Sequence, residues 1–276
     1  PTPVNPTLTP RIGAAKQAGT VTPNGNGTFT VPFTMTLENF GNVPLYDVQV
    51  TDSLSAEFGT YQATAATVDA AGEYTVDDPV VTDSTPIPAL VANTNFTGSG
   101  GNTGLFTVSS TAALEVGRTV TVVFNLTFYP NPATATVSGS TLTFNNAATA
   151  SGDSPDAGGD GNGTADGSTT DTSTNGTDPD DDNDGTVEAS DTDNNPNESV
   201  STPIAVTMDP VIGIAKQAGT VVDNNNGTGT FTVPFTLTIR NYGNVDAHDV
   251  QIIENLTGEF GTYVATTAAV DASGEY

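Results

Sequence analysis

The sequence IGAAKQAGTV at residues 12–21 returns as IGIAKQAGTV at residues 212–221. The similarity extends further: residues 11–74 align with residues 211–276 after one two-residue insertion, Gly229-Thr230, and 42 of the 64 aligned positions are identical. A self-similarity of this length indicates a tandem repeat. We therefore expect one full unit in this chain, followed by the incomplete first part of a second unit.

Within the repeat, apolar and polar residues alternate. One face of the segment 29–37 is apolar, with phenylalanine, valine, methionine and leucine at every second position. Similar alternation recurs at residues 48–52, 105–108, 120–128 and 142–150. A period of two, interrupted by Gly, Pro and Asn turns and without any helical period, predicts an all-β sandwich. Because proline cannot donate a ladder hydrogen bond, Pro32 predicts that its strand is an edge strand or carries a bulge.

The charge is strongly one-sided, with five Lys and Arg against 32 Asp and Glu and a formal net charge of −27. Such a chain repels nucleic acid and anionic membranes, and it favours divalent cations. The sequence contains no cysteine, so neither a disulfide nor thiol chemistry is available. It also contains no long apolar run, and we expect no direct membrane insertion.

The composition changes between residues 153 and 200, which hold 12 Asp, two Glu, no basic residue and no aromatic residue. Too little apolar surface is present there for the segment to collapse by itself. The segment is either a linker or an insertion that precedes a last strand near residues 202–206. Residues 1–10 match residues 201–210 at an offset of 200. We therefore expect residues 1–10 to end a preceding unit and 11–152 to form one repeat. Residues 201–276 should hold a final strand or linker and then the incomplete first part of a second repeat.

Three motifs occur together in a fixed order, namely IGxAKQ, then LxNxGNVxxxDVQVxDxL, then NNAATA. In this order they resemble the Ig-like tandem repeats of unassigned function that occur in very large prokaryotic cell-surface proteins and adhesins. The acidic sequence DPDDDNDG is similar to insertions in bacterial members of that group. The resemblance implies tandem Ig-like β-sandwiches in a secreted, extracellular or surface-attached fibre. Its partners would be neighbouring copies of the repeat, the cell envelope or other cells. It implies no enzyme.

Three polar residues stand in otherwise apolar alternation. Lys16, Asp52 and Asn146 each share a strand face with buried-type apolar neighbours, which places all three in the core. Buried charges need partners, so we expect the three to meet. The set resembles the residues that form intramolecular isopeptide bonds in Ig-like adhesin and pilin domains. Burial would lower the pKa of the lysine and raise that of the acid, which favours attack of the amine on the asparagine carboxamide.

Two interpretations of this set remain open. One is a Lys16–Asn146 crosslink assisted by Asp52, and the other is a buried ion pair of lysine and aspartate with the asparagine hydrogen-bonded beside it. The second copy keeps the lysine as Lys216 and the acid as Glu254. The chain lacks a serine or cysteine nucleophile motif and a phosphate-binding loop, so the sequence predicts no enzyme.

A second set of acidic residues has the spacing of a calcium loop. Oxygen ligands at positions one, three and five, followed by Gly185 at position six, suit Ca²⁺. The candidate ligands are Asp180, Asp182, Asp184, Glu188, Asp191 and Asp193. The alternative is a solvated acidic linker that self-repulsion keeps extended. We thus expect a calcium-stiffened fibre, stalk or adhesin shaft. The competing function is an Ig-like binding module whose loops, for example residues 75–104, recognise a carbohydrate or a protein.

Overall fold

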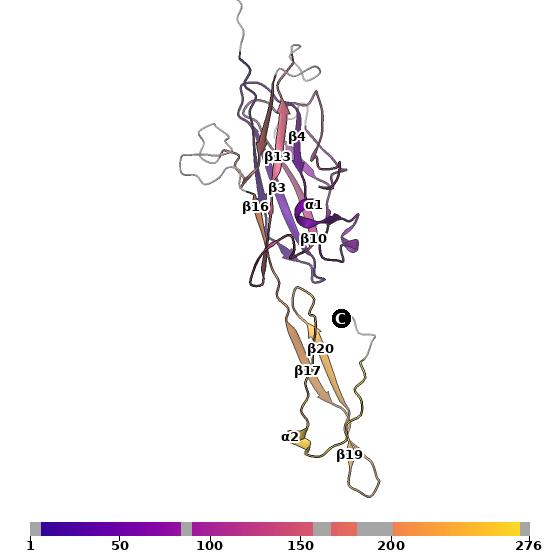
Figure 1. Cartoon of the computed structure of the whole chain (residues 1–276). Helices are drawn as coiled ribbons and strands as arrows, with labels where there is room; N and C mark the ends of the chain where they lie inside the picture. The colour runs from indigo at the N-terminus through magenta and orange to yellow at the C-terminus, as the bar shows by residue number, and fades with distance from the viewer. Residues whose placement is uncertain (1–6, 84–89, 157–166, 181–200, 271–276) are drawn as a thin grey trace, which may run out of the picture. The chain divides into compact units, whose positions relative to one another are not determined.

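The computed structural model describes residues 7–83, 90–156, 167–180 and 201–270 (Figure 1). Contacts between residues divide the chain into unit 1, which ends at Met208, and unit 2, which begins at Asp209. The described residues are mainly strands, so the all-β prediction is confirmed. The helical turns that they contain are short, namely α1 (Ser55–Phe58), the 3-10 turn η1 (Ala65–Thr67) and α2 (Thr257–Phe260).

The main sheet of unit 1 is built on three long antiparallel strands. Its order is β15 (Thr174–Asn175), β1 (Ile12–Ala18), β3 (Phe29–Asn39), β10 (Thr119–Tyr129), β6 (Glu73–Val76) and β5 (Thr60–Tyr61), with β2 (Thr22–Pro23) on β3 and β7 (Val80–Asp83) on β10. The inward faces of β3 and β10 are apolar except for the buried Asn39 at the end of β3, which explains why these two strands form the centre of the sheet.

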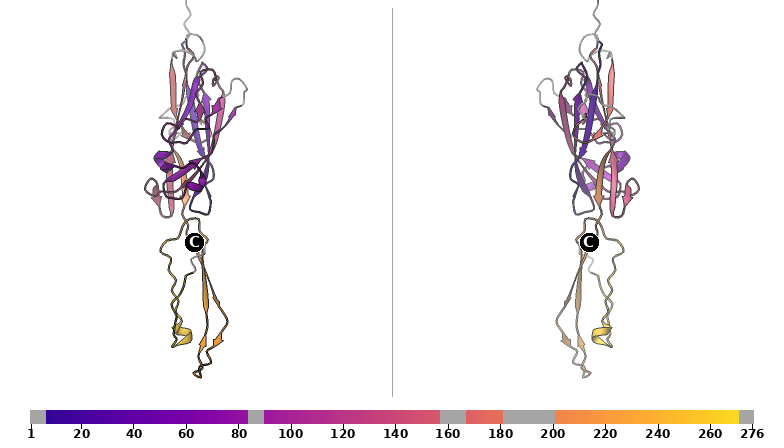
Figure 2. Two further views of the ribbon diagram at one scale, coloured as in Figure 1. Left: turned by 90° about the vertical axis from the view of Figure 1, so that its right-hand side faces the viewer. Right: turned by 90° about the vertical axis from the view of Figure 1, so that its left-hand side faces the viewer.

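Two smaller sheets face the main sheet, and unit 1 is seen from its two sides in Figure 2. One has the order β11 (Thr136–Ser138), β12 (Thr141–Asn146), β16 (Thr202–Thr207), and the other has the order β14 (Ser168–Thr172), β13 (Ala148–Asp153), β4 (Tyr46–Asp52). A further pair, β8 (Val91–Ala92) and β9 (Phe106–Thr107), lies outside these sheets. Phe144 of β12 packs edge-on against Phe128 of β10, with ring centroids 5.4 Å apart, so the core lies between the two layers.

The prediction for Pro32 is wrong in one respect, because β3 is a central strand that pairs with both β1 and β10. The ladder with β1 ends at the pair Ala18 and Phe33, and Phe33 is the residue that follows the proline. The Pro32 carbonyl accepts a bond from the Gly19 N–H at 2.8 Å, so the side of Pro32 that lacks a donor faces the end of β1. The missing N–H therefore removes no bond from the ladder between β3 and β10, and the ladder with β1 stops at this point.

The acidic segment contributes strands that its composition did not indicate. Strand β14 pairs with β13, and β15 runs parallel to β1. After residues 181–200, which lie outside the described residues, β16 pairs antiparallel with β12. The threonines of β14 favour a strand, whereas aspartate disfavours one. Unit 1 thus takes its last strand from beyond the acidic run.

Unit 2 repeats the beginning of unit 1. Its elements are β17 (Ile212–Ala218), β18 (Val222–Asp223), β19 (Phe231–Thr232) and β20 (Phe235–Asn241), followed by α2. The β17–β20 pair runs from Ile212 with Asn241 to Ala218 with Phe235, which reproduces the β1–β3 register residue for residue. Asp47 and Asp249 even share a positive φ, of 49° and 52°.

Candidate functional site

The three polar residues singled out in the sequence lie together in the core of unit 1. Lys16 is on β1, Asp52 is the last residue of β4, and Asn146 is the last residue of β12. Their exposed fractions are 0%, 0% and 2%. Strand alternation turns all three inward, and the pairing of Asp52 with Ala148 places the aspartate beside the point where β12 passes into β13.

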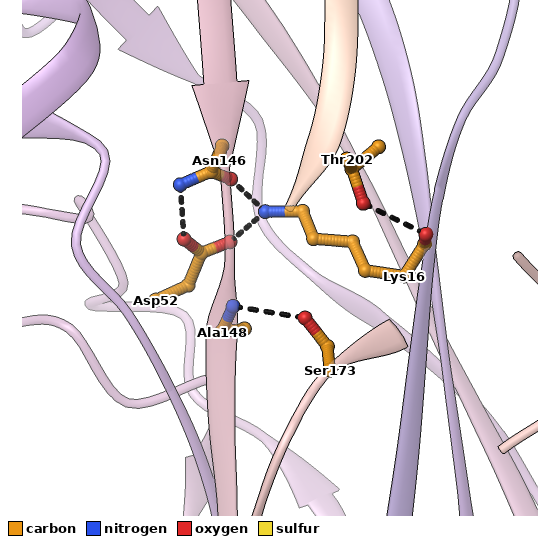
Figure 3. Close-up of polar contacts among 6 residues, drawn as sticks. All are labelled: Lys16, Asp52, Asn146, Ala148, Ser173 and Thr202. Carbon is orange, nitrogen blue, oxygen red and sulfur yellow. Dashed lines mark hydrogen bonds and ion pairs between the residues drawn. The ribbon is translucent and has the colours of Figure 1, made fainter. Parts of the chain in front are cut away.

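The three side chains form a closed ring of contacts (Figure 3). The Lys16 Nζ donates to Asp52 Oδ2 at 2.5 Å and contacts the Oδ1 of Asn146. The Nδ2 of Asn146 donates to Asp52 Oδ1 at 3.1 Å. The two carboxylate oxygens therefore divide their contacts, one on the amine and the other on the carboxamide nitrogen.

Aromatic rings surround the amine. The Lys16 Nζ lies 4.2 Å from the ring centroid of Phe33 and 5.8 Å from that of Phe124. Ring faces attract a cation, but they replace none of the hydrogen bonds that water would make. Burial lowers the pKa of Lys16, and the neighbouring Asp52 carboxylate opposes that shift only in part. The neutral, nucleophilic form of the amine is therefore more accessible than in water.

The backbone around the ring of contacts is held by residues from within the acidic segment and from the strand that follows it. The Lys16 carbonyl accepts hydrogen bonds from the Gly176 N–H at 2.9 Å and the Thr202 hydroxyl at 2.8 Å. The Ala148 N–H donates to Ser173 Oγ at 3.0 Å (Figure 3). Sequence reasoning missed these residues. Thr202 carried a usable signal, because it is in phase with the buried Ile204 and Val206 of β16.

This geometry supports two outcomes. As an ion pair, it satisfies the buried lysine, aspartate and carboxamide through one another, which the burial of charge requires. It also places a nucleophile, a carbonyl group and a proton-carrying carboxylate in mutual contact, which is the arrangement needed for amide formation. The second outcome would join β1 covalently to β12.

Unit 2 contains a second lysine–acid pair. The Lys216 Nζ lies 2.9 Å from Glu254 Oε2, and 4.5 Å from the ring centroid of Phe235. Both side chains are about one third exposed, at 35% and 36%. Lys16 and Lys216 are the two lysines of the whole sequence, so every lysine of the chain stands at this repeated position beside an acid.

The predicted calcium ligands fall mostly outside the described residues. Asp182, Asp184, Glu188, Asp191 and Asp193 lie in residues 181–200, so the calcium site stays a prediction from the sequence. Asp180 is described, is 5% exposed, and its N–H donates to Asp178 Oδ1 at 3.2 Å. Across the part of the chain that the structure describes, no three His, Cys, Asp or Glu side chains gather as a metal-holding group.

Comparisons with known proteins place this chain in no family. No family model matches the sequence, and no curated protein matches it. One solved structure similar to part of the chain is a biomass-sensing module from the Rsgi2 protein of Clostridium thermocellum, described as resembling a family 3 carbohydrate-binding module of the cellulosome. The match has 17% identity, a TM-score of 0.24, and covers 43% of this chain and 66% of that one. A likeness at this level supports no argument. None of the helices in the described ranges has the length and apolar character to cross a membrane.

Proposed function

We propose that the chain is a structural repeat of an extracellular fibre, stalk or adhesin, built from tandem Ig-like sandwiches, and that an isopeptide bond from Lys16 to Asn146 reinforces unit 1. The observation that carries the proposal is the closed ring of contacts among Lys16, Asp52 and Asn146. The sequence contains no cysteine, so a disulfide is not available to brace the unit. A bond made from lysine and asparagine needs neither an oxidant nor an enzyme.

The proposed reaction balances within the three side chains. Asp52 takes one proton from the Lys16 ammonium, and the neutral Nζ attacks the Asn146 Cγ to form the new C–N bond. The carboxylate oxygen that contacts Nδ2 passes the proton to the leaving nitrogen, and the C–Nδ2 bond breaks. The attacking nitrogen then gives up its second proton, through Asp52, to the released nitrogen of Asn146. That nitrogen leaves as ammonium, and Asp52 ends as the carboxylate with which it began.

The position of this bond suits a unit that carries tension. Strand β16 is antiparallel to β12, β12 continues into β13, and β13 is antiparallel to β14. The bonds from Ile12 to Thr169 and from Ala14 to Asp171 show that β14 runs in the same direction as β1. The chain therefore enters unit 1 along β1 and leaves it along β16 in the same direction, with Thr202 beside Lys16. Under load, a Lys16–Asn146 bond would pass force from β1 directly to β12 and shield residues 17–145.

Calcium would complete this function outside the sandwich. Binding to the Asp-rich sequence after Asp178 would cancel the self-repulsion of that segment and stiffen the fibre. Isothermal titration with millimolar Ca²⁺ should release or absorb heat, and the same titration with Asp182→Asn and Asp184→Asn together should not. A flat titration of the unchanged chain would remove calcium from the proposal and leave the crosslink untouched.

The intact mass of the purified chain tests the crosslink directly. We expect a mass lower by one ammonia than the sequence requires, and a linked peptide pair containing Lys16 and Asn146 after proteolysis. The Asn146→Ala variant retains the lysine and the aspartate, so its mass should equal the sequence mass. A full-length mass without the ammonia deficit would leave the ion pair as the role of these residues.

A further inference from the structure

The β17–β20 pair of unit 2 has an apolar face that the described residues leave largely exposed along β17. Ile212 is 45% exposed and Ile214 is 60% exposed, whereas Ile12 and Ala14 of unit 1 are both 1% exposed at the same register positions. In unit 1, β13 and β16 lie against β1, and Asp52 of β4 and Asn146 of β12 contact Lys16. Unit 1 therefore shows what covers such a face in this fold.

Unit 2 also has its reactive pair in place without that cover. The Lys216 Nζ contacts Glu254 and lies over the Phe235 ring, just as Lys16 contacts Asp52 and lies over Phe33. Within the described residues, no carboxamide contacts the Lys216 amine. Two of the three groups required for amide formation are thus assembled, and the third must arrive on another strand.

We infer that Lys216 is a second crosslinking site, which accepts a β segment that carries an asparagine in the sequence setting of residues 141–153. This inference rests on the proposed function, because it requires the same chemistry. Glu254 would take a proton from the Lys216 ammonium, and the neutral amine would attack the asparagine Cγ. The two protons that this nitrogen loses would pass through Glu254 to the leaving nitrogen, which would depart as ammonium as in unit 1.

Unit 1 identifies the segment that fits. In β12 and β13 the residues Leu142, Phe144, Asn146, Ala148 and Ala150 all point inward, so one asparagine interrupts an apolar face. The pairing of Asp52 with Ala148 sets that asparagine two residues before the partner of the acid. A strand with this pattern would cover the isoleucines of unit 2 and bring its carboxamide to the amine.

A longer segment would also satisfy the open strand edge of unit 2. In unit 1, β10 pairs with β3 along ten residues, whereas among the described residues of unit 2 the corresponding edge of β20 has no partner strand. Residues 119–153 contain β10 through β13 in one stretch. A peptide of this sequence therefore supplies the edge strand, the covering strands and the asparagine together.

The test is to incubate the full chain with a synthetic peptide of residues 119–153 and to measure intact mass. We expect one adduct, with the mass of chain plus peptide less one ammonia, which proteolysis maps to Lys216. The peptide with Asn146→Ala should give no adduct, and neither should the chain with Lys216→Arg. The chain with Arg240→Lys provides a matched control, because it adds an exposed amine to β20 that should remain unmodified.

The role of Glu254 is tested with Glu254→Gln, which keeps the shape of the side chain but removes its proton-carrying capacity. We expect the peptide to bind to this variant, as measured by fluorescence anisotropy of a labelled peptide, with loss of the covalent adduct. No adduct with the unchanged chain, or an adduct that maps elsewhere, would overturn the inference. The mass of the chain alone reports the Lys16–Asn146 bond separately, so failure of the inference is distinguishable from failure of the proposed function.

Discussion

Units 1 and 2 begin with nearly the same sequence but place their lysines in different surroundings. Lys16 is fully buried, whereas Lys216 is about one third exposed. Both amines nevertheless contact an acid and lie over a phenylalanine ring at 4.2 and 4.5 Å. The first part of the repeat is therefore sufficient to position the amine and the acid.

Burial and the carboxamide come from sequence that lies far from the lysine. Asn146 follows Lys16 by 130 residues, and Thr202 follows it by 186. Burial lowers the pKa of Lys16 by desolvation, and this requires the covering sheets. The comparison teaches that the placement of the amine beside the acid is a local property of this repeat, whereas the burial that lowers the pKa of Lys16 requires the complete sandwich.

The largest expected difference between the two units is in the length that each gains when it unfolds under force. With the bond from Lys16 to Asn146, residues 17–145 cannot extend when the chain is pulled from its ends. At about 3.5 Å per residue, their release in the Asn146→Ala variant should add roughly 45 nm to the unfolding length. Force spectroscopy measures this directly, and unit 2 should extend equally in both chains. Equal extension of unit 1 in both chains would mean that no bond shields it.

Chemical denaturation should show the next largest difference. A crosslink that closes a loop of this size stabilises a protein by about 5 kcal/mol, mostly by restricting the unfolded chain. Asn146→Ala should therefore lower the unfolding free energy of unit 1 by at least that amount in urea. Lys216→Arg serves as the control and should change it by less than about 1 kcal/mol, because that lysine is partly exposed.

The size of this loss discriminates between the two interpretations of the site. If the residues form only an ion pair, the alanine removes the carboxamide hydrogen bonds and costs about 1–3 kcal/mol. A loss of stability in that smaller range, together with a parent-chain mass equal to the mass that the sequence requires, would contradict the crosslink.

Much of this arrangement could be read from the sequence. Alternation in segments such as 29–37 and 120–128 indicated the strands, and the phase of Lys16, Asp52 and Asn146 indicated that they share a core. Period-two alternation is reliable here because each of these strands has one buried face. The register between strands does not follow from this period, so the ring of contacts required the structure.

Other features could not be predicted because their signals are weak or depend on distant partners. Strand β14 is rich in Thr and contains Asp171, and it is ordered through bonds such as that from the Ala14 N–H to the Asp171 carboxylate at 2.8 Å. Composition alone could not predict that pairing. The edge-strand prediction for Pro32 failed because a proline is tolerated in a central strand when its missing donor faces the end of a neighbouring strand. Where β1 ends could not be predicted from the sequence.

The pH dependence of stability should differ between the parent chain and Asn146→Ala. In the variant, Lys16 keeps a titratable amine whose pKa in the folded state lies below the ordinary value of 10.5. Between those two values the unfolded state binds more protons, so stability should rise with pH by at most about 1.4 kcal/mol per pH unit. If the parent chain is crosslinked, it has no amine at this position and should lack that rise.

This comparison uses the midpoints of urea unfolding, measured at increasing pH from neutral pH. Burial raises the pKa of Tyr74, so tyrosine ionisation destabilises both chains above pH 10.0, and the series should stop there. The difference between the chains removes this shared contribution. If the urea midpoints of the two chains change equally with pH, the ionisation of Lys16 contributes equally to both. That result would contradict a crosslink in the parent chain.

The smallest expected effect concerns the strand that follows the acidic run and completes unit 1. Thr202 is 1% exposed and donates to the Lys16 carbonyl, which also accepts from the Gly176 N–H. Thr202→Val keeps the shape and leaves that carbonyl with one partner, so the loss should be about 1 kcal/mol in urea. The ammonia deficit in the intact mass should remain, because the hydroxyl contacts the backbone rather than the reacting side chains.

Ala205→Thr on the exposed face of β16 is the matched control and should change stability by less than about 0.5 kcal/mol. If Thr202→Val abolished the ammonia deficit, then β16 would be needed to assemble the reactive groups and not only to stabilise the completed unit. Reactivity in unit 2 would then require a counterpart of β16 in addition to the asparagine strand, and the peptide of residues 119–153 would be too short to react.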